Sequence, residues 1–392
     1  MAAVVKTGLE VLRERGFDLL RGERIGLVVH PASVDRDLRH TVDVFLEADG
    51  VDVRRLFGPQ HGIRGETQDN MIEWEGFKDP RTGLPVCSLY GKARRPAEET
   101  LEDLDTLVVD LQDVGTRCYT FIWTMLLCMR ACAESGKRIV VLDRPNPIGG
   151  TRMEGPMLDP AYRSFVGLGP IPMRHGMTMG ELAAFFNESL GVGVRLDVVR
   201  MEGWRRASWF EETGLPWVLP SPNMPTVDTA GVYPGFCLLE GTELSEGRGT
   251  TRPFEIFGAP FIDPYALAER LERHGLPGAV FRALYFQPTF QKWAGKPCGG
   301  AQVHVTDREL FEPVRAAVTV LSAVRESNPS DFSWKSPPYE YEEKKPPIDI
   351  LAGSDVLRKD LESGKPPRDI ALGWRKPLEE FARARERFLH YA

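Results

Sequence analysis

The chain has 392 residues, of which 42% are hydrophobic and 27% charged, a composition typical of a folded globular protein. Its net charge of −7 argues against a general nucleic-acid-binding protein, which needs a basic face, and against adsorption to anionic membranes. The length exceeds that of one ordinary hydrophobic core, so two domains are expected.

The first residues do not resemble a signal peptide, because no basic region precedes an apolar core. No apolar run is long enough to span a bilayer, and we therefore expect a cytoplasmic protein. The six cysteines contain no Cys-x-x-Cys pair, which argues against a zinc site. Cys128 and Cys132 lie one helical turn apart in an apolar stretch, where they are expected to pack as small hydrophobic residues.

Hydrophobic periodicity predicts that strands and helices alternate through the first 200 residues. Apolar runs typical of buried strands cover residues 24–30, 51–57, 107–111, 138–143 and 196–201. Helical stretches are predicted at residues 7–20, 38–48, 121–134 and 178–190. This alternation predicts an α/β fold with a doubly wound, mostly parallel sheet.

The alternation of predicted strands and helices gives way to the proline-rich segment 215–226, and we place a domain boundary near residue 230. The predicted domains are residues 1–230 and a smaller α/β domain of residues 231–392. Its predicted helices cover residues 265–274, 310–325, 354–362 and 378–388, and its strands cover 280–286 and 301–305. Residues 329–347 combine prolines with charged residues and are expected to wrap the surface.

The stretch 56–70 follows a predicted strand directly and is broken by Gly58, Pro59, Gly62 and Gly65. Such glycines allow sharp turns and a close approach of the backbone to a ligand. Its polar residues are Gln60, His61, Arg64, Glu66, Gln68, Asp69 and Asn70. Open α/β sheets bind their ligands at the carboxyl ends of strands, so we expect these side chains to converge on a site. A solvated loop with chance polar residues is the alternative.

Two further predicted strands end in polar clusters, at residues 112–119 and 143–146. In a parallel sheet these clusters open on the same edge as the stretch 56–70. Asp113 and Arg117 could instead form a structural ion pair. Arg144 and Asn146 could instead belong to a rigid turn capped by the asparagine.

A second polar cluster occupies residues 239–255, where carboxylates and guanidiniums alternate with glycines. Its charged residues are Glu240, Glu243, Glu246, Arg248, Arg252 and Glu255. Apolar residues flank the cluster, which places the charges near a buried rim where they must pair with each other or with a ligand. A charged surface hairpin is the alternative. His175 and Lys292 are weaker candidates for a site.

Many carboxylates, amides and aromatic rings around one cleft suit carbohydrate chemistry. A glycosidase needs a protonated carboxylic acid to assist the leaving oxygen. It also needs a carboxylate, or the acetamido group of the substrate, to stabilise the cation-like sugar. Burial or a neighbouring carboxylate raises the pKa of such an acid.

Six motifs run in order along nearly the whole chain. They are Gly-Pro-Gln-His-Gly-Ile-Arg-Gly (58–65), Gln-Asp-Val-Gly-Thr-Arg-Cys-Tyr-Thr (112–120), Leu-Asp-Arg-Pro-Asn-Pro (142–147), Ser-Pro-Asn-Met-Pro-Thr (221–226), Glu-Gly-Thr-Glu-Leu-Ser-Glu-Gly-Arg-Gly-Thr-Thr (240–251) and Asp-Ile-Leu-Ala-Gly-Ser-Asp (349–355). Together they resemble the exo-β-N-acetylmuramidase family, long catalogued as a domain of unknown function.

The resemblance implies a Rossmann-like N-terminal domain, a smaller C-terminal domain and an active site in the cleft between them. It also implies a glycoside hydrolase that releases N-acetylmuramic acid, or a related amino sugar, from the non-reducing end of peptidoglycan fragments. A Rossmann-like sheet often binds a dinucleotide, but no Gly-x-Gly-x-x-Gly stands between an early strand and its helix. We therefore expect no cofactor, and a nucleotide-dependent enzyme is a minor alternative.

One position departs from the family. Members often carry Glu immediately before His-Gly in the first motif, whereas this chain has Gln60, and an amide cannot act as a general acid. We predict that Glu66 and Glu246 supply the catalytic carboxylates, assisted by Asp113 and His61. The predicted substrate-binding residues are Gln60, Arg64, Asp69, Arg117, Tyr119, Arg144, Asn146, Asn223, Glu243 and Arg248. A catalytically silent muropeptide-binding or regulatory protein is the alternative that Gln60 favours.

Overall fold

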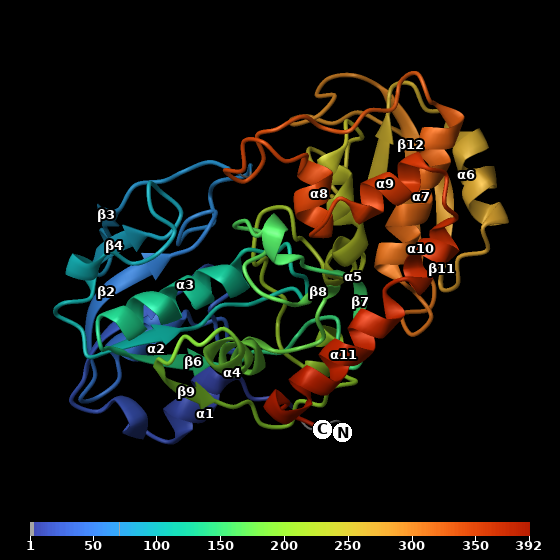
Figure 1. The fold of residues 1–392 in the computed structure, drawn as a ribbon. Coiled ribbons are helices and arrows are strands. Elements are labelled where there is room, and N and C mark those ends of the chain that lie inside the picture. Colours follow the sequence, from blue (N-terminus) through green and yellow to red (C-terminus); the bar gives the residue numbers. More distant parts are fainter. Residues whose placement is uncertain (1–3, 70) are drawn as a thin grey trace.

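The computed structural model describes residues 4–69 and 71–392 (Figure 1), so that Asn70 lies outside the described residues. A seven-stranded sheet in the order β3-β4-β2-β1-β5-β6-β9 forms the centre of the N-terminal part. Its strands are β1 (Arg24–Val28), β2 (Asp52–Gly58), β3 (Phe77–Lys78), β4 (Pro85–Ser88), β5 (Thr106–Val109), β6 (Arg138–Leu142) and β9 (Arg195–Val199). All pairs are parallel except β3 with β4 at the edge.

Helices cover both faces of this sheet. They are α1 (Gly8–Glu14), α2 (Thr41–Leu46), α3 (Phe121–Glu134) and α4 (Met179–Ser189). Val108 of β5 packs into a core with α1 and α2, whereas Leu107 and Val109 pack into a second core with α3 and α4. Successive residues of the strand thus face helices on opposite sides of the sheet. This arrangement is that of a doubly wound, Rossmann-like sheet and confirms the predicted fold class.

The C-terminal part is smaller and is built on an antiparallel sheet in the order β10-β12-β11. Its strands are β10 (Ile256–Ala259), β11 (Ala279–Phe286) and β12 (Cys298–Val305). Its helices are α5 (Val227–Phe236), α6 (Pro264–Arg273), α7 (Pro313–Ser327), α8 (Pro347–Ala352), α9 (Val356–Glu362) and α10 (Pro367–Leu372). The short strands β7 (Glu154–Met157) and β8 (Pro172–Arg174) form a two-stranded sheet of their own.

The last helix, α11 (Arg375–Arg385), leads the chain back to the N-terminal part (Figure 1). Phe381 and Phe388 pack edge-on against Phe185 of α4. The Tyr391 hydroxyl donates a hydrogen bond to Asp143 at 2.5 Å, at the end of β6. In the described part of the chain, no helix is both long and apolar enough to cross a membrane.

The first predicted helix, 7–20, is shorter than expected. It ends after Glu14 because Gly16 and Phe17 adopt φ values of 63° and 55°, in the left-handed region that interrupts a helix. The strands β3, β4 and β10 were not predicted, since they have only two to four residues and show no usable alternation.

Helix α5 was not predicted either, because it contains Gly231, Pro234 and Gly235, which oppose helix formation. It is stabilised by burial against α7. A Cβ atom on Gly235 would lie 1.8 Å from the carbonyl oxygen of Pro313, so only glycine permits this approach.

We predict that Gly235→Ala destabilises the protein by about 3 kcal/mol or more, because the clash is with backbone rather than with a movable side chain. Gly231→Ala, one helical turn earlier, meets only Trp209 at 3.4 Å and should change the stability by less than about 1 kcal/mol. Thermal unfolding of both variants measures the difference. Equal unfolding temperatures would contradict the close packing of α5 on α7.

Candidate active site

A narrow cavity of about 40 Å³ lies where the two parts of the chain meet. Among the described residues, its lining consists of Gln60, His61, Cys118, Tyr119, Thr120, Phe121, Val166, Ser221, Asn223, Met224, Tyr233, Glu240, Arg248, Phe254, Tyr339 and Glu340. The stretch 56–70 and the cluster 239–255 therefore share one cavity, and five of the predicted site residues line it. These five are Gln60, His61, Tyr119, Asn223 and Arg248.

The loop after β2 reaches the cavity through a series of left-handed residues. His61, Gly62 and Gly65 have φ values of 69°, 84° and 69°. Non-glycine residues seldom adopt this conformation, and where they do the surrounding structure must enforce it, often at a functional site. The turn is also tight at Gly58, where a Cβ atom would lie 2.7 Å from the backbone nitrogen of Ile63.

His61 is neutral at pH 7. Its Nδ1 lies 2.8 Å from the carbonyl oxygen of Thr67, which can only accept, so Nδ1 carries the proton and Nε2 is the free acceptor. Burial lowers the pKa of His61 to about 4. The imidazole can thus accept a hydrogen bond from a hydroxyl group in the cavity.

Gln60 forms the centre of a hydrogen-bond network. Its Oε1 accepts from Thr120 Oγ1 at 2.7 Å. Its Nε2 donates to Tyr90 Oη at 3.1 Å and to Glu340 Oε1 at 3.4 Å. The Gln60 amide thus accepts one hydrogen bond from Thr120 and directs its N–H groups at Tyr90 and at the Glu340 carboxyl.

Glu340 is the important residue that sequence reasoning missed. It lies in the segment 329–347, which we expected to wrap the surface, yet only 4% of Glu340 is exposed. Tyr90 Oη donates a hydrogen bond to its Oε2 at 2.9 Å. Burial raises the pKa of Glu340 to about 7, against the hydrogen bond from Tyr90 and with a further contribution from the charge of Glu240.

A strained turn holds Glu340 in the cavity. Tyr339 and Glu342 exchange backbone hydrogen bonds at 2.9 Å, and the two residues between them have φ values of 43° (Glu340) and 68° (Tyr341). Each left-handed non-glycine residue costs about 1–3 kcal/mol, so the turn is maintained by its contacts. Only the pattern Tyr-Glu-Tyr-Glu at 339–342 hinted at a site in the sequence.

Glu240 is the second carboxylate in the cavity. It lies in a short 3₁₀ helix, Cys237–Gly241, that follows α5. Tyr339 Oη donates to its Oε2 at 2.9 Å, and Arg248 Nη2 donates to its Oε1 at 3.3 Å. Both contacts stabilise negative charge on Glu240.

Glu246 lies behind the cavity, where two cations hold it. Its carboxylate is 2.9 Å from Lys292 Nζ and 3.2 Å from Arg248 Nε. Burial acts to raise the pKa of Glu246, but Lys292 and Arg248 outweigh it and leave that pKa lowered. Glu246 is therefore poorly suited to be a general acid, and its contacts make it an anchor for Arg248.

Asn223 and Asp69 connect the glycine-rich loop to its surroundings. Asn223 Nδ2 donates to the carbonyl oxygen of Gln68 at 2.9 Å, and Gln68 Nε2 donates to Asn223 Oδ1 at 3.3 Å. Asp69 accepts a hydrogen bond from Gln291 of the C-terminal part, outside the cavity lining. Tyr119 lines the cavity and packs against Phe121 and Tyr233.

Asp113 and Arg117 do not form the ion pair that we considered. Asp113 Oδ2 accepts from the backbone nitrogen of Gly115 at 2.7 Å and lies 3.1 Å from His175 Nε2. The fully buried Arg117 donates at 2.7–3.0 Å to three carbonyl oxygens, which belong to Pro156, Ile171 and Leu351. The structure places neither residue in the cavity lining.

Arg144 and Asn146 belong to the framework of the sheet edge. Arg144 forms a bidentate pair with Asp110, at 2.5 and 2.8 Å. Asn146 Oδ1 accepts from the backbone nitrogen of Ile148 at 3.2 Å, and its Nδ2 donates to the carbonyl oxygen of Met177 at 3.0 Å. The structure therefore contains the alternative that we considered for these residues, a turn capped by Asn146.

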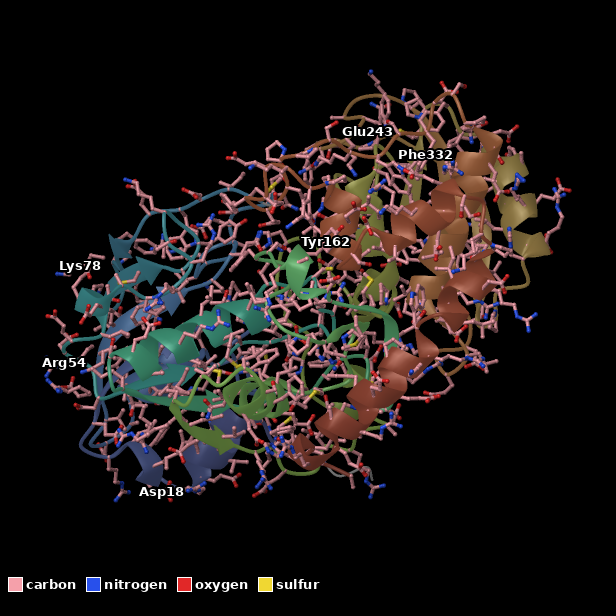
Figure 2. The ribbon with its side chains drawn as sticks, in the orientation of Figure 1. Asp18, Arg54, Lys78, Tyr162, Glu243 and Phe332 are labelled. Atoms are coloured by element: carbon pink, nitrogen blue, oxygen red, sulfur yellow. The ribbon has the colours of Figure 1, made fainter. Side chains whose placement is uncertain are left out.

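The remaining predicted residues lie outside the cavity. Glu66 and Arg64 are exposed, and the Arg64 guanidinium lies over the ring of Phe77 at 4.5 Å. Glu243 is half-buried near Phe332, toward the outer end of the C-terminal part (Figure 2). These positions do not favour direct contact with a ligand in the cavity.

Comparison with known proteins identifies the family of this chain. The family models for the N-terminal and C-terminal domains of exo-β-N-acetylmuramidase NamZ match residues 25–228 and 231–391. The chain is 46% identical over 387 residues to the peptidoglycan β-N-acetylmuramidase NamZ of Bacillus subtilis (strain 168), covering 99% of this chain and 91% of that protein.

Two crystal structures of DUF1343 family proteins from Bacteroides fragilis NCTC 9343 have the same fold. Their TM-scores are 0.90 and 0.78 at 36% and 31% identity, and each match covers 99% of both chains. Because both domain families match over nearly its whole length, the chain belongs to the exo-β-N-acetylmuramidase NamZ family.

Proposed function

We propose that this protein is a glycoside hydrolase that releases N-acetylmuramic acid from the non-reducing end of peptidoglycan fragments. The observation that carries the proposal is the pair of carboxyl groups in one buried cavity, Glu340 with a raised pKa and Glu240 held by Arg248. Two carboxyl groups in different electrostatic surroundings are what an acid-assisted glycosidase requires. The family of the chain and its relative from Bacillus subtilis agree with this activity.

Glu340 acts as the general acid. Its proton passes to the glycosidic oxygen as the bond between that oxygen and the anomeric carbon breaks. Glu240 remains a carboxylate and stabilises the positive charge that develops on the sugar ring. A water oxygen then bonds to the anomeric carbon, and the proton released from that water restores the original protonation of the site.

The other cavity residues recognise the sugar. Arg248 is the one lysine or arginine among the described residues that line the cavity, which makes it the partner for the lactyl carboxylate of muramic acid. The unprotonated Nε2 of His61 and the amide of Asn223 accept or donate hydrogen bonds to sugar hydroxyls. In this scheme Glu246 positions Arg248, and Glu66 has no direct part.

A catalytically silent muropeptide-binding protein is the second candidate, and Gln60 is the observation that favours it. The two candidates differ in turnover. Release of nitrophenol from para-nitrophenyl β-N-acetylmuramide supports the hydrolase, whereas tight binding of muropeptides without release supports the binding protein.

We predict that Glu340→Gln lowers kcat by about 10²–10⁴-fold on a natural β-1,4-linked substrate, because the amide cannot protonate the leaving oxygen. The loss on the nitrophenyl glycoside should be much smaller, since nitrophenolate leaves with little help. Glu240→Gln should lose activity on both substrates alike. The exposed Glu66→Gln serves as the matched control and should retain more than half of the wild-type kcat. Equal losses of Glu340→Gln on both substrates would remove Glu340 from the role of acid.

We also predict that kcat/KM falls as the pH rises through about 7, because Glu340 must be protonated to act and its pKa lies near 7. The hydrogen bond from Tyr90 lowers this pKa, so Tyr90→Phe should move the alkaline limb of the pH profile to higher pH. Tyr265→Phe, at a tyrosine that is 70% exposed, is the control and should leave the profile in place. A shift to lower pH in Tyr90→Phe would contradict the assignment.

A further inference from the structure

A second hollow lies directly outside the cavity and shares Glu340 with it. This outer groove is open to solvent, has a volume of about 380 Å³ and is lined by Glu73, Lys92, Arg94, Arg163, Ser164, Phe165, Glu340, Tyr341 and Glu342. Phe165 lines the groove, and its chain neighbour Val166 lines the cavity. Glu340 therefore stands at the boundary between an inner and an outer hollow.

The strained turn at residues 339–342 contributes residues to both the cavity and the outer groove. Glu340 is 4% exposed and accepts its hydrogen bonds from Tyr90 and Gln60. The next residue, Tyr341, is 49% exposed and lies in the groove. The Arg94 guanidinium lies 3.8 Å from the centre of the Tyr341 ring and 4.4 Å from that of Tyr90, so the aromatic wall of the groove is fixed in place.

Among the described residues, the groove is lined by three cations and three carboxyl groups, and two of the cations have no carboxylate partner. Glu73 is paired with Arg94 at 3.1 Å, and Glu342 lies 3.6 Å from Lys345 and accepts hydrogen bonds from two backbone N–H groups. Lys92 and Arg163 are both exposed, and neither is in an ion pair with another side chain in the described part of the chain. Two positive charges are thus available to an anion that lies along the groove.

An exo-acting glycosidase cleaves between the terminal sugar and the rest of its substrate. The acid that protonates the bridging oxygen must lie between the sites for these two parts, because the oxygen belongs to the bond that joins them. Glu340 has this position between the cavity and the outer groove.

We propose that the outer groove binds the part of the substrate beyond the cleaved bond, and that it selects fragments in which this part carries carboxylates, such as a stem peptide. This inference rests on the proposed hydrolase function. Lys92 and Arg163 attract the carboxylates, and Tyr341 offers an exposed aromatic face to the first sugar ring after the cleaved bond. The groove residues other than Glu340 thereby determine substrate preference without contributing to the bond cleavage.

The test compares two substrates that share the same terminal N-acetylmuramic acid. One continues as a single, neutral N-acetylglucosamine, and the other continues as N-acetylglucosamine followed by a muramic acid with its peptide. The measured quantity is the ratio of kcat/KM for the acidic substrate to kcat/KM for the neutral one. We expect this ratio to exceed one in the wild type and to fall as salt is added.

The double variant Lys92→Glu/Arg163→Glu should lower the ratio by roughly fivefold to tenfold, because two attractive charges become repulsive. The matched control is Lys376→Glu/Arg383→Glu, which changes two exposed cations of α11. It should keep the wild-type ratio. The same ratio in the wild type and in both double variants would overturn the groove as a site for acidic substrates.

Equilibrium binding of the two substrates, measured by calorimetry on the same proteins, separates this inference from the proposed function. If the wild type binds the acidic substrate more tightly but cleaves neither, the hydrolase function fails and the groove stands. If cleavage occurs and neither binding nor turnover responds to the charge reversal, the groove fails and the hydrolase function stands.

Discussion

The hydrogen bonds that converge on the Glu340 carboxyl are the interaction on which this site depends. Gln60 follows β2 and Tyr90 follows β4, so two neighbouring strands of the large sheet supply the donors. The carboxyl itself comes from the C-terminal part of the chain. A buried carboxyl is tolerated only when it is hydrogen-bonded or protonated. Residues of the other domain supply the hydrogen bonds to Glu340, and burial raises its pKa to about 7. The acid is therefore formed by the docking of the two domains.

Gln60 fits this network because an amide can accept and donate at once. It accepts from Thr120 and donates to Glu340 and Tyr90. A glutamate at this position would place a second carboxyl group beside Glu340, and two such groups could be accommodated only by sharing a proton. The hydrogen bond from Gln60 lowers the pKa of Glu340, and burial outweighs it, so that the pKa is about 7.

Three of the arginines that the motifs single out have very different surroundings in the folded protein. Arg117 donates to carbonyl oxygens on both parts of the chain, and Arg144 is held in a bidentate pair with Asp110. Arg248 lines the cavity, between Glu240 and Glu246. In the sequence all three stand in polar motifs near chain breakers, and this local pattern does not separate a buried framework cation from one that faces a ligand.

The sequence by itself determined five of the seven strands of the large sheet, the helices that cover it and the loop that carries Gln60 and His61. Hydrophobic period, breakers and strand ends are local properties, which short segments of chain express directly. Only the tertiary structure decided which carboxyl groups share the cavity. Gln60 and Glu340 are 280 positions apart, and the burial that raises the pKa of Glu340 exists only after the two domains pack together. No local pattern contains that information, because desolvation is a property of everything that surrounds a group in space.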